Sequence, residues 1–229
     1  MKYFILIITL ITLAIGVQAQ PSQLAKHNNQ LARSLTSSTH DLYYIVSPEY
    51  TFEDYKFEVT VFYNGETPVL IVENSSFGEI LQQQIKYYLK NKEMILQETI
   101  SLEKTDEGKT IQQNTRHYYN GGKLVEAYIQ DIKKGGVEGG WNAYTPVIPE
   151  DPNHIQWLVD AANLEGEFYP VLIGYEEELG KDYMVLQTQS VIPFTFQIPT
   201  NIDKQNIGVK DALTLYKKKQ LKSSKELMR

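Results

Sequence analysis

The chain has 229 residues, of which 42% are hydrophobic and 22% charged, with a formal net charge of −6 and no cysteine. The lack of cysteine excludes a small disulfide-stabilised domain, a cysteine-ligated zinc or iron–sulfur centre and a thiol catalyst. The ordinary composition excludes a disordered or fibrous chain, and the acidic balance argues against a nucleic-acid-binding protein, which needs a basic surface.

The N-terminus has the pattern of an export signal. Lys2 precedes an apolar run from Tyr3 to Ile15, and Val17 and Ala19 occupy the small-residue positions of a cleavage site. The run is shorter than the roughly 20 residues that a membrane span needs. We therefore expect residues 1–19 to be a cleaved signal peptide, which implies a periplasmic or extracellular protein without a membrane span after cleavage. An uncleaved membrane anchor is the alternative.

The segment from Ser22 to Thr36 is predicted to be an amphipathic helix capped by Ser22. Its stripe at helical spacing consists of Leu24, His27, Leu31 and Leu35.

Three similar β-hairpins are predicted in the middle of the chain. Phe62 to Leu70, Tyr88 to Leu96 and Tyr118 to Glu126 align without a gap, each with an aromatic residue, a polar turn and an apolar pair. Asn and Gly are frequent in these turns because they tolerate positive φ, and the flanking residues alternate as in strands. The predicted strands are residues 56–63, 67–74, 82–89, 93–102, 111–119 and 123–131. Sequential hairpins favour a meander, and we expect one curved sheet or a partial barrel rather than a repeat array.

The third hairpin, HYYNGGKLVEAY, resembles the tandem tyrosine and NGK-L hairpins of uncharacterised exported proteins from Bacteroidota-type bacteria. It is also similar to MORN-like repeats, although their glycine spacing is absent. The resemblance covers about a third of the chain, at residues 57–131. It implies a hairpin-based fold and an exported location, and it implies no particular activity.

After the hairpins, the Gly- and Pro-rich stretch from Gly135 to Pro149 is predicted to be a loop. A helix is predicted near residues 151–164, with Asp151 as N-cap, Pro152 in the first turn and Gly166 as the stop. Its apolar face consists of Ile155, Leu158, Val159 and Ala162, with Trp157 beside them. Further strands are predicted at residues 167–175, 183–188 and 191–198, and Pro193 and Pro199 confine the last of these to a sheet edge.

The C-terminal segment differs in charge from the rest. Residues 203–229 contain 8 Lys and Arg against 3 Asp and Glu, whereas residues 20–202 contain 13 against 25. We expect a single β-rich domain at residues 20–202 and a basic tail or terminal helix at 203–229, in which Val209, Ala212, Leu213 and Tyr216 share one face.

The predicted fold class is thus α+β and mainly β. It is built on a curved antiparallel meander sheet of six or more strands, with an N-terminal helix and one helix near residues 151–164.

Catalytic motifs are missing from the sequence. The histidines, His27, His40, His117 and His154, show no zinc-binding spacing, and no nucleophile elbow, P-loop or dinucleotide fingerprint is present. No cofactor or metal is expected, and catalytic residues stay unknown. The carboxylates Glu165, Glu167 and the run Glu176 to Glu178 are the remaining candidates for acid–base catalysis or calcium binding; a solvated acidic surface is the plainer interpretation.

Aromatic residues are the feature that points toward a function. The chain has 16 tyrosines, and adjacent aromatic pairs recur in the predicted strands. Because neighbours on a strand point to opposite faces, we expect one ring of each pair in the core and the other on the outer face. The candidate ligand-binding residues are Tyr63, Tyr88 and Tyr119 on the sheet and Trp141 and Tyr144 in the Gly-rich loop. Cross-strand packing alone also explains the pairs.

Two functions follow as hypotheses. The first is a non-catalytic exported binding module that presents aromatic residues on a sheet or loop to a protein, peptide or glycan of the envelope, and not to nucleic acid. The second is an envelope hydrolase that acts on glycan or peptide through acidic residues such as Glu165, Glu167 or Glu176.

Overall fold

A computed structural model describes residues 21–39, 42–105, 107–133, 137–146, 153–189, 192–204 and 207–216. The predicted signal peptide, the predicted cap at Asp151 with Pro152, and most of the basic tail lie outside these residues. No helix within the described residues is long and apolar enough to span a membrane.

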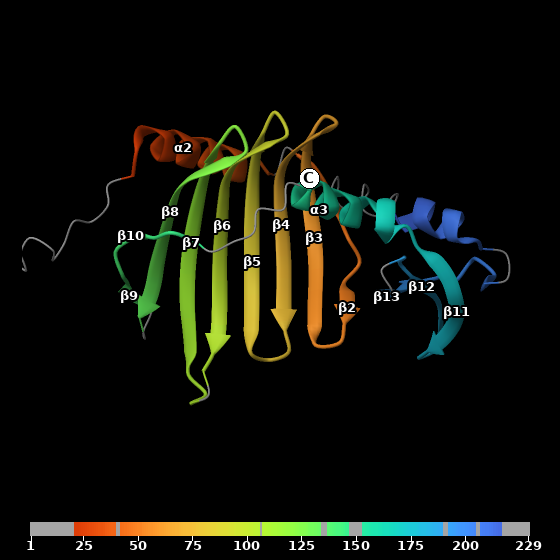
Figure 1. Ribbon diagram of the computed structural model, residues 1–229. Coiled ribbons are helices and arrows are strands. Elements are labelled where there is room, and N and C mark those ends of the chain that lie inside the picture. The colour runs from red at the N-terminus through yellow and green to blue at the C-terminus, as the bar shows by residue number, and fades with distance from the viewer. Residues whose placement is uncertain are drawn as a thin grey trace, which may run out of the picture.

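The hairpin region forms one long antiparallel meander, as the sequence predicts (Figure 1). In the described residues it is a 10-stranded sheet of order β1-β3-β4-β5-β6-β7-β8-β10, with β2 paired to β3 and β9 paired to β8. Its strands are β1 (Tyr43–Val46), β2 (Tyr50–Phe52), β3 (Tyr55–Asn64), β4 (Thr67–Phe77), β5 (Leu81–Lys90), β6 (Glu93–Lys104), β7 (Thr110–Asn120), β8 (Lys123–Lys133), β9 (Val137–Glu138) and β10 (Asn142–Ala143). Among these strands β1 and β10 do not pair with each other, so the sheet is open and is no barrel.

The three hairpins share one detail of geometry. Each has a register shift directly before the turn, between Phe62 and Tyr63, between Tyr88 and Leu89, and between Tyr118 and Tyr119. Such a bulge adds a residue to one strand and increases its twist. The internal similarity of the sequence therefore corresponds to a repeated local structure.

Helix α2 (Gln23–Ser37) lies across one face of the sheet near the hairpin turns (Figure 1). Its predicted cap is confirmed, because the hydroxyl of Ser22 accepts a hydrogen bond from the Ala25 amide at 3.2 Å. The predicted stripe is only partly correct, since His27 is exposed and the buried residues are Ala25, Asn28 and Ala32. Small side chains at these positions let the helix backbone approach the sheet closely. This contact buries Leu70, Tyr88, Leu96, Tyr118 and Tyr128 of the sheet together with Ala25 and Ala32.

The opposite face of the sheet packs against helix α3 (His154–Asn163) and a second, smaller sheet. This small sheet has the order β11 (Val171–Glu178), β12 (Lys181–Gln187), β13 (Pro193–Gln197), so the prediction that the last strand lies at an edge is confirmed. The core between them includes Tyr50, Phe57, Ile71, Tyr87, Leu158, Phe168, Met184 and Phe194. Residues 209–216 are helical and join this core, with Ala212 fully buried and the Tyr216 hydroxyl donating to the Val46 carbonyl.

Several predicted boundaries are corrected. Helix α3 begins at His154, directly after Asn153, and ends at Asn163, with Leu164 as its C-cap; the φ of Leu164 is 56°, in the left-handed region, before the predicted stop at Gly166. The stretch predicted as a loop from Gly135 to Pro149 contains β9 and β10, which form because the exposed edge of β8 offers hydrogen-bonding groups to the returning chain. The strand predicted at residues 167–175 is β11 at Val171–Glu178, preceded by a short 3-10 helix at Gly166–Phe168, so the run Glu176 to Glu178 lies in the strand.

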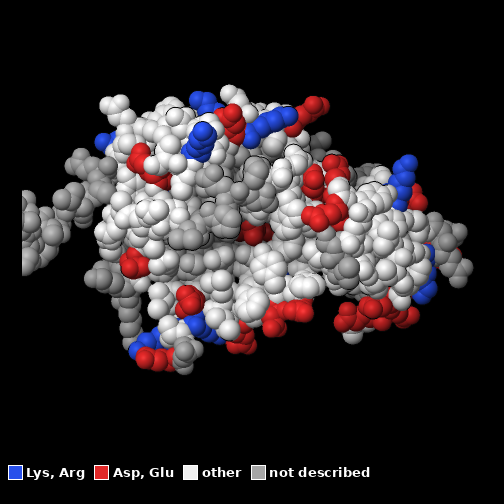
Figure 2. Space-filling view, in the orientation of Figure 1, with Lys and Arg blue, Asp and Glu red and all other residues white. Residues whose placement is uncertain are grey.

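Charged side chains lie mainly at the margins of the face that carries α3 (Figure 2). Acidic side chains gather at the lower tip of the small sheet, where the exposed residues Glu176, Glu177 and Glu178 end strand β11.

Candidate functional site

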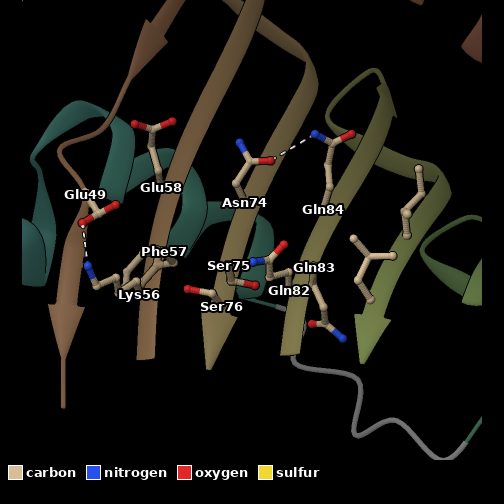
Figure 3. Close-up of a pocket in the computed structure, with 12 residues that line it drawn as sticks. Glu49, Lys56, Phe57, Glu58, Asn74, Ser75, Ser76, Gln82, Gln83 and Gln84 are labelled. Atoms are coloured by element: carbon tan, nitrogen blue, oxygen red, sulfur yellow. Dashed lines mark hydrogen bonds and ion pairs between the residues drawn. The ribbon is translucent and has the colours of Figure 1, made fainter. Parts of the chain in front are cut away.

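The face of the large sheet that carries α2 is covered only near the hairpin turns. Farther along the strands it is hollowed into an open depression of about 410 Å³, which adjoins a smaller one of about 160 Å³ at the shared lining residues Gln84 and Ile100. We call the two together the polar trough (Figure 3). The side chains that line it on this face include Glu49, Lys56, Glu58, Asn74, Gln82, Gln84, Lys86, Glu98, Ile100, Leu102, Asn114, Arg116 and Trp141.

Strand pairing explains why these residues meet. Glu58 is opposite Asn74, Asn74 is opposite Gln84, Gln84 is opposite Ile100, and Ile100 is opposite Asn114. Directly paired residues of antiparallel strands point to the same face, so this row runs across five strands of the sheet. Figure 3 shows Glu58, Asn74 and Gln84 side by side on neighbouring strands, with α3 behind the sheet.

Amide side chains lie between the charged residues of the trough. Gln84 donates to the Asn74 side-chain oxygen at 3.0 Å, and Asn114 donates to the Gln130 side-chain oxygen at 3.3 Å. Gln130 donates to the Gly139 carbonyl at 2.8 Å, which ties the returning chain to the sheet. A primary amide has two donor hydrogens and an accepting oxygen, so Asn74, Gln84 and Asn114 keep capacity for a ligand hydroxyl or amide, whereas Gln130 is buried.

Trp141 closes one end of the trough. The Arg116 guanidinium lies over its indole ring at 4.4 Å from the ring centroid, within the range of a cation–π contact. Arg116 also donates to Glu98 at 2.8 Å, and Glu98 accepts from the Tyr88 hydroxyl at 3.0 Å. The ring is thus held by a chain of contacts that begins in the core beneath α2.

The charges of the trough balance. Three basic residues, Lys56, Lys86 and Arg116, face three acidic residues, Glu49, Glu58 and Glu98. Two pairs are already joined, Lys56 to Glu49 at 3.4 Å and Arg116 to Glu98 at 2.8 Å. Burial, and then the negative charge of Glu49, raise the pKa of the Glu58 carboxyl. The trough is therefore polar without a strong net field.

The aromatic residues predicted as ligand contacts do not come together. Tyr63, Tyr88 and Tyr119 are buried, so the expectation of an exposed outer ring is wrong for each. The alternation itself is confirmed, since Tyr87 packs in the α3 core and Tyr88 in the α2 cluster. For Tyr87 and Tyr88 both rings are buried because each face of the sheet there packs against a core of its own.

Trp141 and Tyr144 are half-buried and lie on opposite faces of the sheet. Trp141 contacts Arg116 and the Tyr144 hydroxyl is hydrogen-bonded to His117, and these partners are neighbours on β7. Burial lowers the pKa of the His117 imidazole, and its Nδ1 has no hydrogen-bond partner within the described residues. Only Trp141 of the five predicted residues lines the trough.

The predicted carboxylates lie on separate elements. Glu165 and Glu167 flank Gly166 after α3, while Glu176 to Glu178 are on the exposed strand β11. The described residues contain no group of three or more His, Asp or Glu that could hold a metal ion. A different carboxylate, Glu73, is buried beneath α3 and accepts from the Tyr87 hydroxyl at 2.9 Å, with His154 Nε2 at 3.8 Å.

The amides of the trough were missed by the sequence reasoning. The sequence carries little signal for them, because Gln82 to Gln84 and Gln112 to Asn114 are continuous polar runs that do not distinguish one face of a strand from the other. The register needed to join these faces appears only once the strands pair.

Comparison of the chain with protein-family models, curated proteins and solved structures finds no match in any of the three.

Proposed function

We propose that the protein is an exported, non-catalytic binding module whose polar trough binds a neutral glycan of the cell envelope. The observation that carries this proposal is the row of paired residues across five strands, in which Asn74, Gln84 and Asn114 supply amide groups, in a trough that the ring of Trp141 also lines. Ligand sites commonly combine apolar or aromatic surface with a few placed polar groups. An open trough across many strands suits an extended chain better than a compact small molecule.

The chemistry of the lining favours a neutral ligand. The balanced charges offer no net attraction to an ion, whereas amides can donate to and accept from sugar hydroxyls. An aromatic ring supplies a flat apolar surface for a sugar face, with a polar edge. Peptides remain the next class to test, because the same amides can pair with a peptide backbone.

A binding experiment with matched variants tests the proposal. Calorimetric titration of the protein with neutral oligosaccharides from envelope glycans should give saturable binding. Trp141→Ala is expected to weaken it by about tenfold or more, the loss typical of a central aromatic contact. Phe77→Ala removes another half-exposed ring, outside the trough, and should leave the affinity within about twofold. Absence of binding to the whole panel, or equal effects of the two variants, would overturn the proposal.

A second candidate, hydrolysis of the same ligand, is favoured by one feature of the trough. The raised pKa of Glu58 is a property of carboxyls that act as general acids. The earlier candidates Glu165, Glu167 and Glu176 lie outside the trough lining. Incubation of the wild type and of Glu58→Gln with the same glycans separates the two functions, since only a hydrolase releases shorter sugars and loses that release in the variant.

The exported location belongs to the same proposal and rests on the N-terminal pattern and on the resemblance of the hairpins. Mass spectrometry of the protein recovered from outside the cytoplasm should find an N-terminus at Gln20. An intact Met1 would contradict it.

A further inference from the structure

Strand β11 is an edge strand with one free side. Within the described residues it pairs only with β12, and its other hydrogen-bonding edge faces no strand. Natural proteins usually protect such an edge with charged side chains, Pro, a β-bulge or a covering element. Strand β13, the opposite edge, begins with Pro193, whereas β11, VLIGYEEE, contains no Pro or Lys and has charged residues only in its second half.

Exposed apolar side chains are concentrated on and beside this strand. Of the twelve large hydrophobic residues that are exposed in the described part of the chain, six lie between residues 169 and 179. They are Tyr169, Val171, Leu172, Ile173, Tyr175 and Leu179. Ile173 is 54% exposed and is the extra residue of a bulge, so it has no cross-strand partner in β12. Such clustering marks an interaction surface, unlike the scattered apolar residues of an ordinary surface.

The second half of the strand is acidic. Glu176, Glu177 and Glu178 are exposed, and none of them forms an ion pair with a described residue. Lys204 forms an ion pair with Asp182 of β12 at 2.8 Å and interacts more weakly with Glu177, and Lys181 lies opposite Glu178 on the β12 side. The edge therefore presents an apolar half followed by a half with negative charge.

This polarity argues against a second copy of the chain as the occupant. Antiparallel pairing of two β11 strands would place the glutamates of one opposite the apolar residues of the other, where they would lose water without gaining a partner. Parallel pairing would place glutamates opposite glutamates, and like charges across strands are destabilising. A partner strand with basic residues opposite the glutamates and apolar residues opposite Val171 to Ile173 would pair favourably with both halves of the edge.

From an edge that no described strand covers, the apolar cluster and the exposed glutamates, we infer that β11 binds an extended segment of a partner protein by strand addition. The segment runs antiparallel to β11, like every pair in the small sheet. Its Lys or Arg residues therefore come first along its chain, opposite Glu176 to Glu178, and its β-branched apolar residues follow, opposite Val171 to Ile173. Main-chain hydrogen bonds supply affinity in this mode, and side chains supply specificity. The inference is independent of the trough.

A suitable probe is a short amidated peptide of sequence Lys-Lys-Lys-Thr-Val-Ile-Val. Fluorescence anisotropy should show binding to the wild type and affinity about tenfold lower or worse for a peptide of reversed order. The triple variant E176K/E177K/E178K and the single variant Ile173→Lys should each weaken binding by about tenfold or more. A matched triple variant on the large sheet, E66K/E93K/E103K, changes three exposed glutamates in the same way and should stay within about twofold.

Amide hydrogen exchange gives a second readout, in which the peptide should protect backbone amides of β11 and leave β13 unchanged. Equal binding of the two peptide orders, or equal losses in the two triple variants, would show mere charge attraction and overturn the inference. A wild-type dimer in sedimentation that Ile173→Lys dissociates would also overturn it, because a second copy would then be the occupant.

Discussion

The hydroxyl of Tyr87 donates a hydrogen bond of 2.9 Å to the buried carboxylate of Glu73, in the interior between the large sheet and α3. Tyr55 donates to the other carboxylate oxygen at 3.5 Å, and His154 Nε2 lies 3.0 Å from the Tyr87 hydroxyl. Burial, and then the charge of Glu73, raise the pKa of Tyr87, so its hydroxyl keeps its proton and remains a donor. A polar group in this core is tolerated because its partners surround it.

Tyr87→Phe should destabilise the protein by about 1–3 kcal/mol, because it leaves a buried carboxylate without its shortest hydrogen bond. Urea unfolding followed by circular dichroism measures the change. Tyr55→Phe is the matched control, since its bond to Glu73 is longer and its ring is less buried, and its cost should be smaller. Equal costs for the two variants would contradict a special role of the Tyr87 hydroxyl.

Asn28→Ala should loosen α2 from the sheet. The buried Asn28 amide donates to the Ile95 carbonyl at 2.8 Å and to the Tyr119 carbonyl at 3.3 Å, and so joins the helix to two hairpins. Loss of both bonds is expected to cost about 1–3 kcal/mol in urea unfolding. Gln30→Ala on the exposed side of the same helix should change stability by about 0.5 kcal/mol at most. A larger effect at Gln30 than at Asn28 would show that helix propensity matters more than the contact.

Lys92→Gly should stabilise the second hairpin. Asn91 and Lys92 have φ values of 53° and 68°, and the third hairpin places Gly121 and Gly122 at the equivalent positions. A side chain in the left-handed region costs roughly 1–2 kcal/mol, against about 0.5–1 kcal/mol for the extra freedom of glycine in the unfolded chain. We expect a net gain of about 0.5–1 kcal/mol, seen as a higher urea midpoint with an unchanged slope. A lower midpoint would mean that the Lys92 side chain makes a contact worth more than the strain.

Glu58→Gln should stabilise the protein at neutral pH and lose this advantage in acid. The pKa of Glu58 is raised, so the folded state holds this proton more tightly than the unfolded state, and wild-type stability falls as pH rises through the folded pKa. Glutamine cannot ionise, so the variant does not lose stability in this way as the pH rises. Because the carboxyl is partly open to solvent, the gain at about pH 7 should stay below about 1 kcal/mol. Urea unfolding at neutral pH and below the ordinary glutamate pKa of about 4.3 checks it. An advantage that grows on acidification would contradict the assignment.

The strands of the large sheet could be predicted closely because their signals are local. The turn around Asn64 and Gly65 and the alternation of Phe57, Val59 and Val61 are readable within a few residues, and both appear as predicted in the structure. The same local signals placed the face of the terminal helix, where Val209, Ala212 and Leu213 do pack on the core. These local signals did not predict the buried face of α2, because small residues of that helix, and not its leucine stripe, allow its backbone to approach the sheet closely.

The outcome for tyrosine shows the limit of strand alternation. Alternation correctly separates Tyr87 from Tyr88, but it cannot show that each face has its own helical cover. Whether an aromatic ring is exposed to solvent or buried depends on which element packs against that face of the sheet. Such packing joins residues that are far apart in the chain. The rings of Tyr63 and Tyr88 are core residues for this reason.

The sequence by itself determined the cysteine-free chemistry, the predicted export signal and the meander, because composition, hydrophobic runs and turn residues act over short distances. Only the tertiary structure decided which polar residues share a surface. Asn74, Gln84 and Asn114 form one row because strand pairing fixes their register, and the edge of β11 is free because no other described strand reaches it. Both candidate binding surfaces thus arise from pairing between distant segments, which no local pattern encodes.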